Sequence, residues 1–259
     1  MNKKKISPKD PRSTAASRFE QLWRERFQKF GIKQEDDAGI AGWSSTGLAA
    51  RQKHFSQHWE PGIAGSLWLD AGCGAGTYTR QLNREGMRTV GLDYSAPSLR
   101  KARHKSQMDI LWAVADVNTM PLKSSAFDGA LCFGVTQSLS DSAVVCRELF
   151  RVVRPGAQVW VDGLNSWCLP HVFAGIIRRL RQRPIHLRYE DPRRIVRLFK
   201  AGGMARVRLL WLPIFPARLA GLQWLLETRS SRWLLQKIAL LGLFCSHSFV
   251  VTGVKKGQD

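Results

Sequence analysis

The middle of the chain alternates between short apolar runs and amphipathic stretches. Short apolar runs bounded by turn residues predict buried strands, and apolar side chains three or four positions apart predict helices. Their strict alternation predicts an α/β fold with a parallel, doubly wound sheet and right-handed crossovers. The expected strands are 66–70, 88–93, 110–115, 127–133 and 158–164, and the expected helices are 76–85, 95–105 and 139–153.

The two ends of the chain follow other patterns. Residues 1–17 are rich in lysine, proline and serine, which predicts a flexible basic tail. Aromatic residues at helical spacing predict an amphipathic helix over 18–30 that stops at Gly31, and a second helix is expected over 48–59. The remaining expected elements are a helix at 191–200, a strand at 206–212, a mainly helical stretch at 217–244 and a final strand at 246–254.

A glycine-rich turn joins the first strand to its helix, in the sequence Leu-Asp-Ala-Gly-Cys-Gly-Ala-Gly at 69–76. Gly72, Gly74 and Gly76 permit a tight turn and let a ligand lie against bare backbone, while Asp70 can accept from a cationic or hydroxyl-bearing ligand. The spacing is not the G-x-G-x-x-G of dinucleotide sites, and no lysine follows as in triphosphate sites. The alternative is a turn whose glycines serve the backbone only.

Two further acids end the next two strands. Asp93 ends the second strand, where a carboxylate can accept both hydroxyls of a ribose. Asp116 ends the third, where it can accept an adenine amino proton while the N–H of Val117 meets a ring nitrogen. Each acid alone could be a turn or N-cap residue. Together with the glycine turn they predict a site for an adenosine-bearing cation without phosphate.

At this point the chain resembles the class I S-adenosylmethionine-dependent methyltransferases, in the methyltransferase type 11 group that includes ubiquinone and menaquinone biosynthesis enzymes. The resemblance implies a Rossmann-like, seven-stranded, mostly parallel sheet with an antiparallel last strand. The apolar pattern adds N-terminal helices and a helical insert between the last two strands. It implies S-adenosyl-L-methionine as the cofactor. The matching segments are 69–76, 91–95, 115–122, 127–130 and 149–156.

The resemblance also implies roles for individual residues. The turn from Asp70 to Gly76 would hold the methionine part of the cofactor, and Asp93 the ribose. Tyr94 would pack on the adenine, whose edge Asp116 and Val117 would contact. Near the sulfonium methyl the resemblance places Phe133 and Gly134.

We expect a flexible tail at 1–17 and a single methyltransferase domain at 18–259. The resemblance covers roughly 48–165 well and 190–254 loosely, and it does not explain residues 1–47 or the insert at 213–244. Within this domain we expect an N-terminal helical cap at 18–62 and a cofactor-binding half at 63–165. A substrate half at 166–259 would contain the helical insert at 213–244.

Charge adds a possible class of partner. The chain holds 40 Lys and Arg against 20 Asp and Glu; the net charge is +6 over 1–150 and +14 over 151–259. A basic half predicts contact with nucleic acid, anionic lipid or a phosphorylated substrate, and a merely solvated basic surface is the alternative. Five scattered cysteines without C-x-x-C pairing, no secretory signal and no transmembrane segment favour the cytoplasm.

Catalytic residues are less evident than the cofactor site. A general base is needed only if the acceptor arrives protonated, and His54, His58 and Gln137 are candidates for substrate contact. The two histidines share a helix face, but no third ligand is evident and no metal is expected. After the fourth strand the chain lacks the Asn/Asp-Pro-Pro-aromatic tetrad of nucleic-acid amino methyltransferases, and it lacks a Pro-Cys pair there.

The substrate-binding part is expected in the Leu- and Trp-rich insert. Apolar faces with flanking cations fit a helix lying at a membrane surface, a lid over a lipophilic substrate, or a helical pair with its own core. We therefore predict methyl transfer to an oxygen or carbon of a small lipophilic or anionic acceptor. Peripheral contact with the anionic inner membrane face is expected through 167–183 and 217–244. The alternatives are an RNA methyltransferase that uses the basic half and a non-catalytic binding protein.

Overall fold

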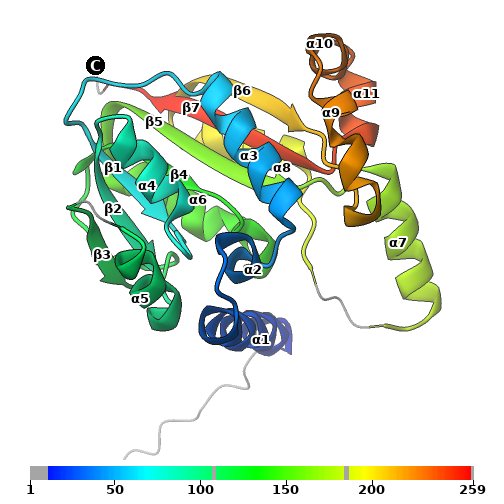
Figure 1. Cartoon of the computed structure of the whole chain (residues 1–259), viewed down its shortest axis with the longest axis horizontal. Coiled ribbons are helices and arrows are strands. Elements are labelled where there is room, and N and C mark those ends of the chain that lie inside the picture. Colours follow the sequence, from blue (N-terminus) through cyan, green and yellow to red (C-terminus); the bar gives the residue numbers. More distant parts are fainter. Residues whose placement is uncertain (1–10, 107–108, 184–186, 258–259) are drawn as a thin grey trace, which may run out of the picture.

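The sheet of this protein has seven strands in the order β3-β2-β1-β4-β5-β7-β6 (Figure 1). The structure is a computed structural model that describes residues 11–106, 109–183 and 187–257. All strands run parallel except β7, which is antiparallel to both β5 and β6. This confirms the predicted fold class. The strands are β1 Leu67–Ala71, β2 Arg88–Asp93, β3 Leu111–Val114, β4 Phe127–Cys132, β5 Val153–Leu164, β6 Met204–Leu212 and β7 Ser248–Lys255.

The order of the strands places a crevice beside the end of β1. From β1 the chain proceeds outward through β2 and β3, then returns to the other side of β1 with β4 and β5. Ligands of open α/β sheets bind outside the carboxyl ends of the strands where the strand order reverses. The glycine turn follows β1 directly, and Asp93 is the last residue of β2.

Helices bury both faces of the sheet. On one face, α6 (Ser142–Val152) and α8 (Pro192–Ala201) bury Leu149, Ile195 and Phe199 against the strands. On the other, α3 (Ser45–His58) and α4 (Thr77–Arg84) form an aromatic core with Trp68 and Trp160. Strands that are buried on both faces are rich in apolar residues, which is why the sequence predicted them. Two shorter elements, α5 (Ala96–His104) and η1 (Thr136–Ser138), follow β2 and β4 in the chain.

The N-terminal helices differ from the predictions in two places. Helix α1 spans Pro11–Lys33, so part of the predicted 1–17 tail is helical; residues 1–10 lie outside the described residues. Gly31 does not end α1, which continues to Lys33. Instead it permits close packing on α5, since a Cβ there would lie 2.5 Å from the Oγ of Ser98. A short helix not predicted, α2 (Asp37–Ala41), is capped by Asp36, which accepts from the backbone N–H of Gly39.

The starts of one strand and one helix also differ from the predicted positions. Strand β5 starts at Val153 rather than 158, because Val153 already pairs with Phe127 and the predicted turn at 154–156 is an irregularity within the strand. The helix predicted over 139–153 begins only at Ser142, after Asp141 as its N-cap.

The C-terminal half carries the helices least covered by the rest of the protein. Helix α7 (Leu169–Leu180) has no buried residue. The insert between β6 and β7 contains η2 (Ala217–Leu222), α9 (Gln223–Leu226), α10 (Arg229–Lys237) and α11 (Ala239–Cys245). Helices α7, α9, α10 and α11 stand at the same end of the molecule (Figure 1). Among the described residues no helix is long and apolar enough to cross a membrane.

Candidate functional site

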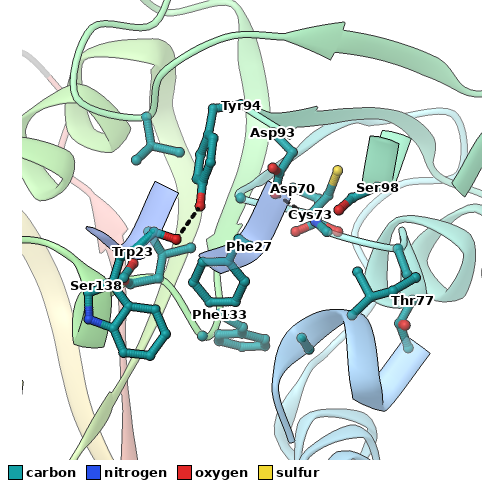
Figure 2. Close-up of a pocket in the computed structure, with 18 of the residues that line it drawn as sticks. Trp23, Phe27, Asp70, Cys73, Thr77, Asp93, Tyr94, Ser98, Phe133 and Ser138 are labelled. Atoms are coloured by element: carbon teal, nitrogen blue, oxygen red, sulfur yellow. Dashed lines mark hydrogen bonds between the residues drawn. The ribbon is translucent and has the colours of Figure 1, made fainter. Parts of the chain in front are cut away.

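A pocket opens at the carboxyl ends of β1, β2 and β4, and residues of α1 and α2 form its other wall. It encloses about 930 Å³ of space free of atoms, part of it open to solvent. Figure 2 shows Asp70 and Asp93 on one side of the pocket, with the rings of Trp23, Phe27 and Phe133 apart from them. Of the predicted cofactor residues, those lining it are Asp70, Gly72, Gly74, Asp93, Tyr94, Asp116, Val117, Phe133 and Gly134.

The glycine turn is held in a conformation that side chains disfavour. Gly72, Gly74 and Gly76 have φ angles of 79°, 52° and 76°, in the left-handed region that glycine tolerates without a Cβ clash. The backbone N–H of Gly72 donates to the carbonyl of Leu92 at 2.7 Å, which ties the turn to the end of β2. Gly76 does not line the pocket: it is the N-cap residue of α4.

Two buried carboxylates stand beside the turn. Asp70 is 2% exposed and accepts from the hydroxyl of Thr79 at 2.6 Å, and burial raises its pKa to about 7. Asp93 accepts from the backbone N–H groups of Gly74 at 2.9 Å and Ser95 at 2.7 Å. Burial raises the pKa of Asp93 too, against the lowering effect of these hydrogen bonds. Before any ligand is considered, Asp93 is thus oriented by backbone N–H groups and Asp70 by the hydroxyl of Thr79.

The third predicted acid contacts the N-terminal helix. Asp116 accepts from the backbone N–H of Asn118 at 2.9 Å, and its other oxygen pairs with the guanidinium of Arg24 on α1. The Arg24 guanidinium also lies 5.5 Å from the ring centre of Tyr94. The Tyr94 hydroxyl donates to the carbonyl of Trp23 at 3.3 Å, drawn as a dashed line in Figure 2. Helix α1 is therefore fastened to the end of the pocket where the adenine was expected.

The opposite end of the pocket is closed by Trp43. Gly134, just after β4, has φ of 76°, and a Cβ there would lie 2.5 Å from the indole ring of Trp43. The backbone N–H of Gly134 donates to the carboxylate of Asp162 at 2.7 Å. Beside it, Phe133 packs edge-on against Tyr78 with ring centres 4.9 Å apart. Among the residues that the structure describes, the buried hydroxyl of Tyr78 has no hydrogen-bond partner, so this polar group is available to a ligand.

The sequence comparisons agree with this geometry. Residues 69–161 match the family described as a methyltransferase domain. The malonyl-[acyl-carrier protein] O-methyltransferase of Pseudescherichia vulneris is 36% identical over 104 residues, which cover 40% of this chain and 41% of that protein. The ubiquinone biosynthesis O-methyltransferase of Sodalis glossinidius (strain morsitans) is 29% identical over 133 residues, covering 48% and 53%. Residues 69–161 of this chain are thus similar to a methyltransferase domain, in agreement with the resemblance to the class I S-adenosylmethionine-dependent methyltransferases.

The fold comparison shows the same fold over nearly the whole chain. Magnesium protoporphyrin IX methyltransferase of Synechocystis PCC 6803, solved with bound S-adenosylhomocysteine, superimposes with a TM-score of 0.60 at 13% identity. The match covers 95% of this chain and all of that one. The predicted resemblance, fold and cofactor, S-adenosyl-L-methionine, are confirmed. The chain spans about half the length of the curated relatives it matches.

The candidate catalytic residues His54, His58 and Gln137 do not line this pocket. His54 is buried with its ring 4.3 Å from that of His58, and burial followed by the charge of His58 lowers the His54 pKa to about 3. Nδ1 of His58 lies 2.8 Å from the carbonyl of His54, a bond within the helix. Gln137 lines a neighbouring pocket instead. Among the described residues no three His, Cys, Asp or Glu side chains cluster closely enough to hold a metal ion.

Sequence reasoning missed the wall that the N-terminal helices supply to the methyltransferase pocket. The aromatic face of 18–30 signalled a buried helix, but nothing in the sequence says which surface it covers. Likewise, the positions of Asp93 and Asp116 in the sequence do not indicate that Arg24 and Asp37 also line the pocket. The missed lining residues of this wall include Glu20, Trp23, Arg24, Phe27, Asp37, Ile40 and Trp43.

Proposed function

We propose that this protein transfers a methyl group from S-adenosyl-L-methionine to an oxygen or carbon of a small lipophilic or anionic acceptor. The observation that carries the proposal is the pocket lining, where Asp70, Asp93 and Asp116 stand around the glycine turn. Arg24 is the one cationic side chain among the described lining residues, and it is paired with Asp116. This charge balance suits an adenosine-bearing cation and disfavours a phosphate group.

The proposed roles follow the geometry of the pocket. Asp93 accepts from the ribose hydroxyls, and Asp70 with the turn at 72–76 holds the methionine part. The adenine lies between Tyr94 and the edge formed by Asp116 and Val117. At the far end, Phe133 and Gly134 surround the sulfonium methyl. These roles keep the assignments expected from the sequence, with Gly76 acting through the shape of the turn.

Methyl transfer mainly requires that the acceptor atom be aligned with the methyl group of the cofactor. The sulfonium cofactor supplies a methyl group that is already activated, so the protein contributes proximity, orientation and exclusion of water. The aromatic side chains of the pocket, among them Trp23, Phe27, Trp43 and Phe133, exclude water around the proposed transfer site. The names of both curated relatives describe O-methyltransferases, which supports an oxygen acceptor. We also propose the division into a cap at 18–62, a cofactor half at 63–165 and a substrate half at 166–259.

A direct test combines binding with product detection. We expect calorimetry to show binding of S-adenosyl-L-methionine, with ATP and NAD giving no heat. In cell extracts, mass spectrometry should find metabolites that lack one methyl mass increment when the protein is deleted. Restoring the wild-type protein should restore these metabolites. Loss of the increment on RNA nucleosides alone would favour the RNA methyltransferase instead, and no cofactor binding would overturn the proposal.

We further propose that α7 and the insert contact an anionic membrane surface. Their large apolar side chains are exposed and close to cations, and the segments 167–183 and 213–244 hold eight arginines and lysines against one acid, Glu227. An interfacial helix presents this combination: apolar groups enter the headgroup region and cations attract anionic lipids. The exposed apolar residues are Leu169, Val172, Phe173, Ile176, Ile177, Leu180, Leu219, Leu222, Trp224, Leu225, Trp233, Leu234, Ile238 and Leu240.

The double variant Trp224→Ser, Trp233→Ser is expected to reduce co-sedimentation with phosphatidylglycerol-containing liposomes several-fold. Both indoles are 62% exposed, so their loss removes apolar area from the membrane contact without opening a core. Binding by the wild type should fall at high salt, because the cations are screened. The matched control is Ile63→Ser, an exposed apolar residue outside these segments. Equal binding by the double variant and the control would contradict the membrane proposal.

A further inference from the structure

We propose that a second pocket, which shares a wall with the cofactor pocket, binds the acceptor, and that this acceptor is an aromatic acid. The proposal rests on the proposed methyltransferase function and names the substrate class for it. We call this the Arg51 pocket. Among the side chains that line it are Arg26, Trp43, Arg51, Gln137, Tyr189 and His247.

The position of the Arg51 pocket is the first argument. Trp23, Ala41 and Trp43 line both pockets. Trp43 packs directly on Gly134, the end of the cofactor pocket proposed for the sulfonium methyl. The Trp43 indole therefore lies between the Arg51 pocket and the proposed position of the methyl group. Its outer wall includes Leu187, Tyr189 and 214–216, in the segments that follow α7 and begin the insert. A lipophilic acceptor would thus enter from the proposed membrane side.

The charge of the lining is the second argument. Arg51 is 6% exposed, and the described lining contains Arg51 and Arg26 but no aspartate or glutamate. The Arg51 Nη1 donates to the carbonyl of Gly47 at 3.2 Å, and Nη2 donates to the Ser248 hydroxyl at 3.1 Å. These two bonds leave most of the five guanidinium protons available.

Two buried donors that border this pocket have no hydrogen-bond partner among the described residues. The Arg51 Nε lies 3.8 Å from Oδ2 of the buried Asp162, which is within ion-pair distance but too far for a hydrogen bond, while Asp162 accepts from the Gly134 N–H through its other oxygen, Oδ1. The Trp43 Nε1 is also buried and unpartnered, and the Arg51 guanidinium lies 4.3 Å from its ring centre. Buried donors without partners are rare in folded proteins. A carboxylate, which offers several lone pairs in a plane, would satisfy a guanidinium in this position.

The ring is inferred from the remaining walls. Trp23, Phe30, Trp43, Tyr189 and Phe215 all contribute aromatic side chains to the lining. The Tyr189 ring is itself held by His171, with ring centres 4.5 Å apart. Aromatic walls favour a planar, apolar body through stacked and edge-on contacts. Together with the buried cation they select a ring that bears a carboxylate.

The experiment compares a charged probe with a neutral probe of the same shape. The protein is first saturated with S-adenosylhomocysteine, and 2-naphthoate or 2-naphthamide is then titrated by calorimetry. We expect naphthoate to bind about tenfold more tightly, since charge-assisted hydrogen bonds are about twice as strong as neutral ones. Arg51→Met should abolish this preference, whereas Tyr189→Ala should weaken both probes alike. The matched control is Arg88→Gln, an exposed arginine at the start of β2.

The outcomes separate the acceptor class from the methyltransferase function. If the protein binds S-adenosylhomocysteine but not naphthoate, or binds both probes equally, the aromatic acid is wrong and the methyltransferase function stands. If naphthoate binds with the Arg51 dependence but no adenosyl cofactor binds, the function is wrong. Because Arg51 is buried, circular dichroism and cofactor binding must show that Arg51→Met is folded. Should it not fold, Tyr189→Ala decides: unchanged affinity for both probes overturns the proposal.

Discussion

Asp93→Asn is expected to weaken the binding of S-adenosyl-L-methionine by about 100-fold, or about 3 kcal/mol. The carboxylate is buried and oriented by Gly74 and Ser95, so in the proposed site the ribose meets an acceptor that needs no reorganisation. The amide has one acceptor oxygen in place of two and loses the negative charge, so each hydroxyl hydrogen bond is lost or weakened. Calorimetric titration with the cofactor measures the change directly.

The control for Asp93 is Asp109→Asn, which makes the same change at an exposed aspartate. Thermal unfolding of both variants without cofactor shows whether the glycine turn has been disturbed. A folded Asp93→Asn protein with wild-type affinity would remove Asp93 from the proposed ribose site. It would leave the similarity of residues 69–161 to a methyltransferase domain intact, because that similarity rests on the sequence match.

Asp70→Asn is expected to stabilise the cofactor-free protein by about 3 kcal/mol near pH 8 relative to its effect near pH 5. Burial raises the Asp70 pKa from 3.8 to about 7, so the folded protein binds a proton between these values that the unfolded chain has released. This stability is present below the unfolded pKa and is lost as the pH rises through about 7. The neutral amide has no proton to lose, so this loss disappears in the variant.

Urea unfolding of the wild type and Asp70→Asn, each at both pH values, measures the effect. The pKa values of Asp93 and Asp162 are raised by burial as well, that of Asp162 to about 6, so the wild type contains more than one such contribution. The difference between the two proteins isolates Asp70. Parallel loss of stability in both proteins would mean that Asp70 is ionised in the fold at about pH 5. The Asp70→Asn variant should also bind the cofactor less tightly, because the ammonium group of the cofactor would no longer face a carboxylate.

These two acids show why a cofactor site can be less stable than the rest of a fold. A carboxylate without a full cation partner is costly in the core, and it remains there because the surrounding backbone orients it. The bound cofactor would provide the missing positive charge. Stability and binding at this site are therefore coupled through the same side chains.

The sequence by itself determined the strands, the glycine turn and the positions of the acids in the proposed cofactor-binding half. Asp70, Asp93 and Asp116 were recognisable because parallel strands end at one edge of a sheet, so position along each strand already places the side chain. The turn at 72–76 was recognisable because its backbone favours glycine. Buried strands contain short apolar runs, such as 67–69 in β1 and 130–132 in β4, and these runs made the strands predictable from the sequence.

Only the tertiary structure decided what surrounds those acids. The ion pair of Arg24 with Asp116 spans 92 positions, and the bond of Arg51 to Ser248 spans 197. No periodicity along the chain encodes such contacts, because they depend on how α1, α2 and α3 pack on the finished sheet. The sequence pattern showed that these helices have apolar faces. Packing determined that α1 and α2 form a wall of the cofactor pocket and that Arg51 is buried in the pocket beside it.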